Sequence, residues 1–280
     1  LDVAHEPGTT AARRWILSEA SRRLSESNEV MLYSDLGYML AGEMVARADG
    51  ANDGRALART VRRRVTEPLE IHKRVRFAGA LEAEERAELS RTVAPTERCA
   101  WRGRMVRGEV HDENCAALGG VSSHAGLFGT AEGVAHFGTA LLDSKAGRSD
   151  FLAQPTLEHA LAERPGGSYR LGFDVKSGDT PAAGRRASPS TFGHLGFTGT
   201  SFWCDPGRDV VVVLLTTRVH PSRANEKIRA FRPALHDGLL AALDSANPRP
   251  TTPPTPTPTS HPTPPSNVSR GARASCTGRS

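Results

Sequence analysis

The stretch that decides the fold is Gly193-His194-Leu195-Gly196-Phe197-Thr198-Gly199-Thr200-Ser201-Phe202-Trp203-Cys204-Asp205-Pro206, and an apolar run over residues 210–215 follows it. Residues 200–204 alternate in character and residues 209–217 are rich in β-branched types, so both segments indicate strands. The turn between them, residues 205–209, carries Pro and Gly where a hairpin needs them. We predict an antiparallel hairpin here and a further strand over residues 169–176.

Helical patterns lie on both sides of these strands. The sequence predicts helices over residues 11–24, 35–48, 54–66 and 130–143, and a closing helix over residues 222–243. Thr130 is the expected N-cap of the fourth helix, with Glu132 in its first turn. An antiparallel sheet that ends in a packed helix, with a helical subdomain before it, is an α+β layout.

The C-terminal segment differs from the rest of the chain. Residues 247–265 are dense in Pro and Thr, a composition that favours extended chain and cannot build a core. The last fifteen residues are polar and Arg-rich. We therefore expect one domain over residues 1–246 and a Pro/Thr-rich disordered tail over residues 247–280.

Charge and composition exclude several classes of function. The formal net charge is +5, but residues 247–280 hold four arginines and no acid, so the other residues carry only +1 by subtraction. No nucleic-acid partner is expected on this balance, and the local run over residues 59–64 is either a basic patch or a solvated helix face. No run approaches the roughly 18 apolar residues of a membrane span, so no transmembrane segment is predicted.

The cysteines point to neither a metal nor a cofactor. Cys99, Cys115, Cys204 and Cys276 are widely spaced and form no C-x-x-C pair, so no metal site is expected. A disulfide between Cys99 and Cys115 stays open at this stage. Neither His-Glu-x-x-His nor the phosphate-cradling Gly-x-x-x-x-Gly-Lys occurs, and no cofactor is predicted.

Two short segments carry side chains suited to catalysis. In Tyr33-Ser34-Asp35 the phenol can act as a base at neutral pH only with cations close by, because its ordinary pKa is about 10. Asp35 is either a site residue or the N-cap of the following helix. His194 can face a substrate carboxylate or a catalytic phenol, or be a surface histidine with satisfied hydrogen bonds. The glycines beside it permit a close backbone approach, and exposed N–H groups at a strand end can hold an acyl oxygen.

Three ordered segments resemble the serine β-lactamase and penicillin-binding-protein superfamily, in particular hydrolases related to D-alanyl-D-alanine carboxypeptidases. They are residues 33–43, residues 101–128 and the motif His194-Leu195-Gly196. The resemblance implies a β-lactamase/transpeptidase-like antiparallel sheet flanked by helices. It implies catalytic roles for Tyr33, Asp35 and His194. It also implies substrate binding by Gly196 and by Phe197, whose N–H would donate to an oxyanion. Asp35 departs from the family's Asn and adds a negative charge.

The middle segment contains three consecutive polar residues, His111-Asp112-Glu113. Side chains of consecutive residues in a regular element cannot all face one ion, so metal binding is not expected. We expect these residues to line the cleft or to hold their loop by hydrogen bonds.

The family's nucleophile motif, Ser-x-x-Lys, is not found, because no serine of the 280 residues has a lysine three positions later. We therefore expect the nucleophile helix and the N-terminal strands to be missing and the chain to be inactive as it stands. The implied activity is acyl-enzyme hydrolysis of a small ester, amide or D-amino-acid peptide, with peptidoglycan-like peptides among the substrates. The alternatives are a catalytically dead module that binds a ligand or partner, and a truncated gene product. The compartment stays unassigned.

Overall fold

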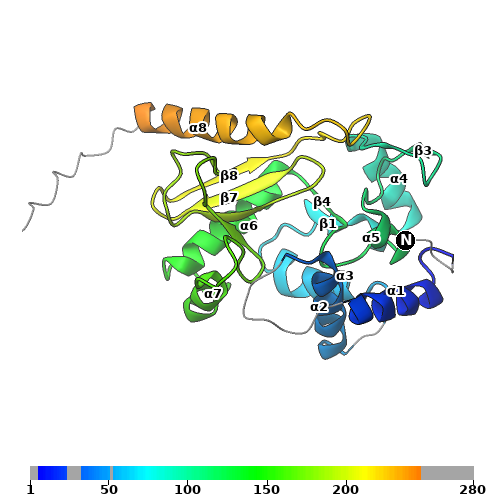
Figure 1. Cartoon of the computed structure of the whole chain (residues 1–280). Coiled ribbons are helices and arrows are strands. Elements are labelled where there is room, and N and C mark those ends of the chain that lie inside the picture. Colours follow the sequence, from blue (N-terminus) through cyan, green and yellow to red (C-terminus); the bar gives the residue numbers. More distant parts are fainter. Residues whose placement is uncertain (1–5, 24–32, 51–52, 247–280) are drawn as a thin grey trace, which may run out of the picture.

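The computed structural model of the chain describes residues 6–23, 33–50 and 53–246 (Figure 1). The tail predicted for residues 247–280 lies outside the described residues. The described elements are α1 (Thr10–Arg23), α2 (Asp35–Ala48), α3 (Ala56–Val61), η1 (Arg62–Thr66), β1 (Val75–Phe77), η2 (Ala78–Ala80), α4 (Ala83–Thr92), β2 (Arg98–Cys99), β3 (Arg104–Met105), α5 (Glu113–Ala117), β4 (Leu127–Gly129), α6 (Ala131–Lys145), α7 (Gln154–Leu161), β5 (Asp174–Val175), β6 (Phe192–Leu195), β7 (Ser201–Asp205), β8 (Val210–Leu214) and α8 (Ile228–Ala246).

The main sheet is antiparallel, with the strand order β5-β6-β7-β8. In the β7–β8 hairpin Ser201 pairs with Leu214 and Asp205 pairs with Val210, so the predicted hairpin is confirmed. The strand predicted over residues 169–176 is much shorter and consists of β5 alone. The chain folds back on itself before β5, because Tyr169 bridges to Asp174 across a tight turn.

Helices cover both faces of this sheet, and the side chains of β7 alternate between them. Phe202 and Cys204 belong to the cluster that contains Leu141 of α6. Trp203, between them, packs with Leu240 of α8 on the other face. Figure 1 shows α6 and α8 on opposite sides of the sheet. This period of two along the strand produces the α+β arrangement that the sequence predicts.

The second part of the fold is helical, with α1, α2, α3 and α5 packed together and the small β1–β4 sheet beside them. Its clusters centre on Ile16 with Met39 and on Leu57 with Phe77. Thr130 caps α6 as predicted, since its side chain accepts a hydrogen bond from the Gly133 N–H at 3.1 Å.

Several predicted boundaries are wrong for identifiable reasons. The helix predicted over residues 54–66 begins at Ala56 and changes at Arg62 into the π-helical turn η1. The closing helix begins at Ile228 rather than at residue 222, because residues 217–223 form a loop that bonds to residues 95–98. Helix α4 was not predicted, since it buries none of its residues and so gives no apolar periodicity.

The structure also shows how the arginines of residues 59–64 and the cysteines are used. The arginines of the run 59–64 are all ion-paired with Asp49, Asp53 or Glu67, which supports the solvated face over a free basic patch. Cys99 and Cys115 are buried free thiols, so the possible disulfide is absent. Among the described residues, no helix combines the length and apolar character needed to cross a bilayer.

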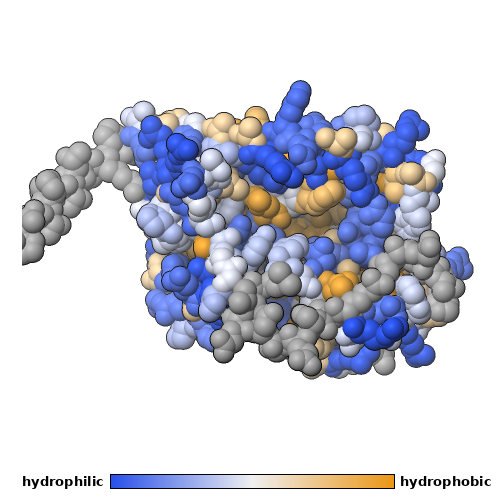
Figure 2. All heavy atoms as spheres, viewed as in Figure 1, coloured by the Kyte–Doolittle hydropathy of each residue, from blue (hydrophilic) through white to orange (hydrophobic). Residues whose placement is uncertain are grey.

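The two parts meet through the loop that follows β8. Thr217 Oγ1 donates to the Pro95 carbonyl at 3.0 Å, and the Arg98 N–H donates to the Pro221 carbonyl at 3.0 Å. Figure 2 shows apolar surface gathered in a hollow between the part that holds the sheet and the part that holds α2 and α3. The end of β6 with its following turn, and the start of α2, are the segments that the sequence marks for catalysis.

Candidate active site

Residues 196–200, between β6 and β7, form a tight turn whose carbonyl groups are all occupied. Gly199 has a φ of +117°, and a Cβ there would lie 2.8 Å from the backbone nitrogen of Arg218, so glycine is required. The carbonyl acceptors and their donors are Gly196 with Gly199 N (3.0 Å) and Arg232 Nη2 (2.7 Å), Phe197 with Arg218 Nε (2.8 Å), Thr198 with Arg218 N (2.8 Å), Gly199 with Thr216 Oγ1 (2.6 Å), and Thr200 with Gly196 N (2.8 Å) and Arg232 Nη2 (2.7 Å).

This turn, called the 196–200 turn below, leaves the N–H of Phe197 without a partner within the described residues. The N–H and the carbonyl of Gly196 are both used inside the turn, so this residue shapes the turn rather than offering a backbone group to a ligand. An unpartnered backbone N–H is the kind of donor that an oxyanion site uses.

His194 lies at the end of β6, just before the turn. Its Nδ1 is 2.7 Å from the Leu195 carbonyl oxygen. A carbonyl can only accept, so Nδ1 carries a proton and donates it to this bond. In the neutral ring Nε2 then carries no proton, and its lone pair takes no part in the bond to Leu195. His194 can therefore accept a hydrogen bond or a proton at Nε2.

Tyr33 and Asp35 form a pair at the start of α2. The N-cap of α2 is Ser34, whose side chain accepts from the Gly37 N–H, so the alternative that Asp35 caps this helix is wrong. Asp35 instead accepts a 2.8 Å hydrogen bond from the Tyr33 hydroxyl. Partial burial, and then this bond and the carboxylate charge, raise the pKa of Tyr33 well above its ordinary value. The environment thus favours the neutral phenol.

The two predicted catalytic segments meet in space. The ring of Tyr33 lies 6.1 Å from the ring of His194, although 160 positions separate them in the sequence. A third ring, Tyr169, lies 5.2 Å from Tyr33 and 6.5 Å from His194. Sequence reasoning missed Tyr169, because it was assigned to a strand and not to the turn that precedes β5. The three rings form a single aromatic group beside the end of β6.

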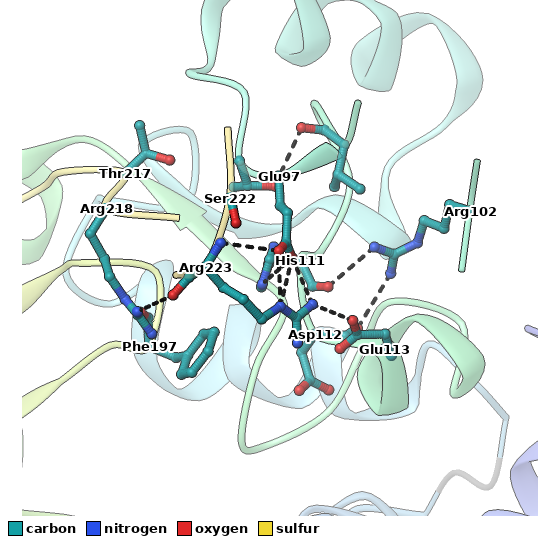
Figure 3. A network of polar contacts seen from close by, with 12 residues as sticks. Glu97, Arg102, His111, Asp112, Glu113, Phe197, Thr217, Arg218, Ser222 and Arg223 are labelled. Carbon is teal, nitrogen blue, oxygen red and sulfur yellow. Dashed lines mark hydrogen bonds and ion pairs between the residues drawn. The ribbon is translucent and has the colours of Figure 1, made fainter. Parts of the chain in front are cut away.

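A polar network fixes the other side of the turn (Figure 3). Arg223 pairs with Glu97 at 2.6 Å and also with Glu113, and its hydrogen bond lowers the pKa of Glu97. The ring of His111 stacks on that of Phe197 at 5.8 Å, and the Arg218 guanidinium lies 4.3 Å from the Phe197 ring centre. Burial, and next the charge of Arg223, lower the pKa of His111, so its ring is held neutral.

The consecutive residues His111, Asp112 and Glu113 have separate roles. Asp112 caps α5 through the Cys115 N–H at 2.7 Å and lies 2.9 Å from Nε2 of His124. The Glu113 carboxylate forms an ion pair with Arg223, while the His111 ring stacks on the Phe197 ring. Within the residues that the structure describes, no group of His, Cys, Asp or Glu could hold a metal ion. Asp112 and Glu113 hold this loop by hydrogen bonds, as expected, whereas the ring nitrogens of His111 have no hydrogen-bond partner within the described residues.

The fold is the one found in solved β-lactamase-like proteins. A solved β-lactamase from Mycobacterium bovis matches with a TM-score of 0.53 and 22% identity over 84% of this chain and 75% of that one. A penicillin-binding protein homologue from Caulobacter crescentus matches with a TM-score of 0.52 and 18% identity over 82% and 67%. Simvastatin synthase from Aspergillus terreus matches with a TM-score of 0.54 and 14% identity over 85% and 64%. At these identities the likeness is one of fold.

The sequence comparisons identify the family. The chain belongs to the Beta-lactamase family, whose profile matches residues 6–272. An Escherichia coli K12 protein named "Putative D-alanyl-D-alanine carboxypeptidase" is 30% identical over 206 residues, which are 68% of this chain and 45% of that protein. A Salmonella gallinarum protein of the same name is 35% identical over 132 residues, 45% of this chain and 31% of that one. The matches therefore span less than half the length of these curated relatives.

Proposed function

We propose that this chain provides the tyrosine, the histidine and the oxyanion-binding turn of a serine-hydrolase site for a small ester, an amide or a peptide that ends in a D-amino acid. The observation that carries the proposal is that the rings of Tyr33 and His194 lie 6.1 Å apart, and that the unpartnered N–H of Phe197 follows three residues after His194. The names of the curated relatives favour a D-alanyl-D-alanine peptide as the substrate.

Each group has a defined part in this proposal. The Phe197 N–H donates to the substrate carbonyl oxygen as negative charge develops on it. Nε2 of His194 accepts a hydrogen bond from a hydroxyl or amide N–H of the bound substrate. Tyr33, neutral in its present surroundings, donates its hydroxyl hydrogen to Asp35, so its oxygen is left to accept a hydrogen bond from the substrate. It would accept a proton only with a cation beside it, as in a protein that also carries a Ser-x-x-Lys lysine.

A non-catalytic binding module is the second candidate, and one observation favours it. No serine of the printed sequence is followed by lysine three positions later, so the family's nucleophile and base are not among these residues. In both candidates the chain binds the substrate's acyl and D-amino-acid groups. They differ in whether a covalent acyl-enzyme forms.

Binding and labelling of the chain test the substrate half of the proposal. We expect saturable calorimetric binding of N-acetyl-D-alanyl-D-alanine, and no acyl adduct by mass spectrometry after incubation with a fluorescent penicillin. Tyr33→Phe and His194→Ala should each weaken binding by about tenfold, which is the loss of roughly one good hydrogen bond. The exposed His159 on α7 supplies the control, since His159→Ala should bind as the unchanged chain does. Absence of saturable binding would overturn the proposed substrate class.

Sequencing the gene upstream of the codon for Leu1 separates the two candidates. An in-frame Ser-x-x-Lys would allow a longer protein to be made, in which Tyr33→Phe should lower ester or peptide turnover about 100-fold or more. A longer protein that turns over equally well with phenylalanine at this position would contradict the catalytic role of Tyr33. A stop codon directly upstream would leave the binding module as the function.

A further inference from the structure

In the peptide group between Gly196 and Phe197, the carbonyl is hydrogen-bonded and the N–H is not, within the described residues. Its carbonyl oxygen accepts a 2.7 Å hydrogen bond from Nη2 of Arg232, which lies on α8. Its N–H, that of Phe197, has no partner within the described residues. This peptide is trans, so its C=O and N–H point in opposite directions. The N–H therefore points away from Arg232.

The next peptide repeats the pattern. The Phe197 carbonyl accepts a 2.8 Å hydrogen bond from Nε of Arg218, and the N–H of the same peptide, that of Thr198, donates to no group within the described part of the chain. Two consecutive free N–H groups thus belong to peptides whose carbonyls are each bound by an arginine. Successive backbone N–H groups in a turn are able to bind an anionic oxygen together.

Arg232 carries a buried charge without a carboxylate partner. Its side chain sits in the inner stripe of α8, where Ile228, Arg232, His236 and Leu240 are buried at intervals of four. Only 8% of Arg232 is exposed, and within the described residues its guanidinium bonds to carbonyl oxygens and forms no ion pair. Its recorded hydrogen bonds go to the carbonyls of Gly196 and Thr200. A guanidinium this close to an amide carbonyl is a charge-assisted donor that polarises the amide and strengthens the opposite N–H as a donor.

We propose that Arg232 and Arg218 are positioning residues that orient and polarise the N–H groups of Phe197 and Thr198 for a substrate carbonyl oxygen that becomes negative. The inference rests on the proposed function for its ligand, but its structural part stands without any ligand. Arg232 acts from behind the 196–200 turn and never touches the substrate. The occupied carbonyls prevent the turn from rotating its peptides, so the N–H groups stay directed to the site.

A measurement without ligand tests the positioning role first. The amide ¹H and ¹⁵N shifts of Phe197 are recorded for the unchanged chain, Arg232→Met, Arg232→Lys and the control Arg229→Met. Arg229 is on the same helix but is exposed and pairs only locally with Glu226. We expect the Phe197 amide proton to move upfield in R232M and to stay nearly in place in R232K and R229M, because lysine keeps a cationic donor.

Folding of the test variant is checked by its melting temperature. In R232M the Gly196 and Thr200 carbonyls retain the donors Gly199 N and Gly196 N, so no carbonyl is orphaned. Should R232M fail to fold, R218M is read at the Thr198 amide in the same way. A folded R232M, or in its place R218M, with an unmoved amide shift would overturn the inference.

Affinity for N-acetyl-D-alanyl-D-alanine is the second readout. We expect R232M to bind about tenfold more weakly and R232K to recover most of the affinity, since one charge-assisted hydrogen bond is involved. Equal affinities of R232M and the unchanged chain would contradict the positioning role. If the unchanged chain binds no such peptide, the proposed substrate fails, while the amide shifts still decide whether the arginines polarise the turn.

Discussion

The hydroxyl group of Tyr33 donates a 2.8 Å hydrogen bond to Oδ1 of Asp35, two residues further along the chain. The bond and the adjacent negative charge both favour the protonated phenol, and with partial burial they raise the pKa of Tyr33. The family resemblance described above implies an Asn at the position of Asp35. This pair therefore sets how readily Tyr33 exchanges a proton.

Replacing Asp35 by Asn should lower the pKa of Tyr33, because the amide removes the negative charge that opposes the phenolate. The chain has only three tyrosines, so ultraviolet titration with Tyr33→Phe as the reference isolates this group. The apparent pKa should fall in D35N and should not change in Asp174→Asn, where the carboxylate acts on Tyr169 instead. An unchanged Tyr33 titration in D35N would contradict the role given to Asp35.

Tyr169 should contribute to substrate affinity through its ring. Its ring packs 5.2 Å from Tyr33, so Tyr169→Leu removes one wall of the aromatic group. We expect a loss of affinity for the peptide ligand of about two- to twelvefold, since aromatic contacts contribute about 0.5–1.5 kcal/mol. Tyr169→Phe should bind nearly as the unchanged chain. The exposed Leu171 in the same turn serves as the control in L171A, and equal losses in Y169L and L171A would point to a general disturbance of the turn.

His236 should make the protein less stable in mild acid. It is 1% exposed on α8, and burial, with the charge of Arg232 next, lowers its pKa from 6.5 to about 4. Between these values the unfolded chain binds a proton that the native state refuses, so the unfolding free energy falls as the pH is lowered from 6.5 to 4. The loss amounts to about 3 kcal/mol at the lower end.

Urea unfolding at several pH values measures this effect. His236→Gln should remove this share of the pH dependence, whereas the exposed His159→Gln should keep it. If H236Q loses stability with acid as steeply as the unchanged chain, the buried neutral histidine is not its source.

The pair of Glu97 and Arg223 should stabilise the junction between the loops around the 196–200 turn. The Glu97 side chain is 9% exposed, and it holds Arg223 through several hydrogen bonds, so Glu97→Gln should cost about 1–2 kcal/mol of unfolding free energy. This loss is smaller than that expected for a fully buried ion pair, because Arg223 is partly exposed. Glu226→Gln, in an exposed pair with Arg229, should change little. Similar losses in both variants would argue against a special role for Glu97.

The sequence was informative where local pattern decides the structure. The β7–β8 hairpin depends on alternation and on a Pro-Gly turn, both of which are local, and α2 and the Thr130 cap follow from similar signals. Helix α4 is polar on all sides, so periodicity had nothing to detect. Only the family resemblance predicted that Tyr33 and His194 belong to one site, because no local sequence rule relates residues so far apart in the chain.

The closing helix contains a sequence signal for a part of the site that the sequence analysis did not predict. In the closing helix, Arg232 and His236 occupy the same apolar stripe as Ile228 and Leu240, and a charged residue in such a stripe needs a buried partner. That partner turned out to be the 196–200 turn. Tyr169 left no comparable signal, since its position depends on how the chain folds back before β5.

We propose that Tyr33, His194 and the Phe197 N–H form one acyl-binding site. An NMR titration of the isotope-labelled chain with N-acetyl-D-alanyl-D-alanine tests this directly. We expect saturable shifts that are largest at the amides of Phe197 and Thr198 and at the rings of His194 and Tyr33. Saturable shifts confined to another surface, or no shift at these four residues up to the solubility limit of the peptide, would contradict it.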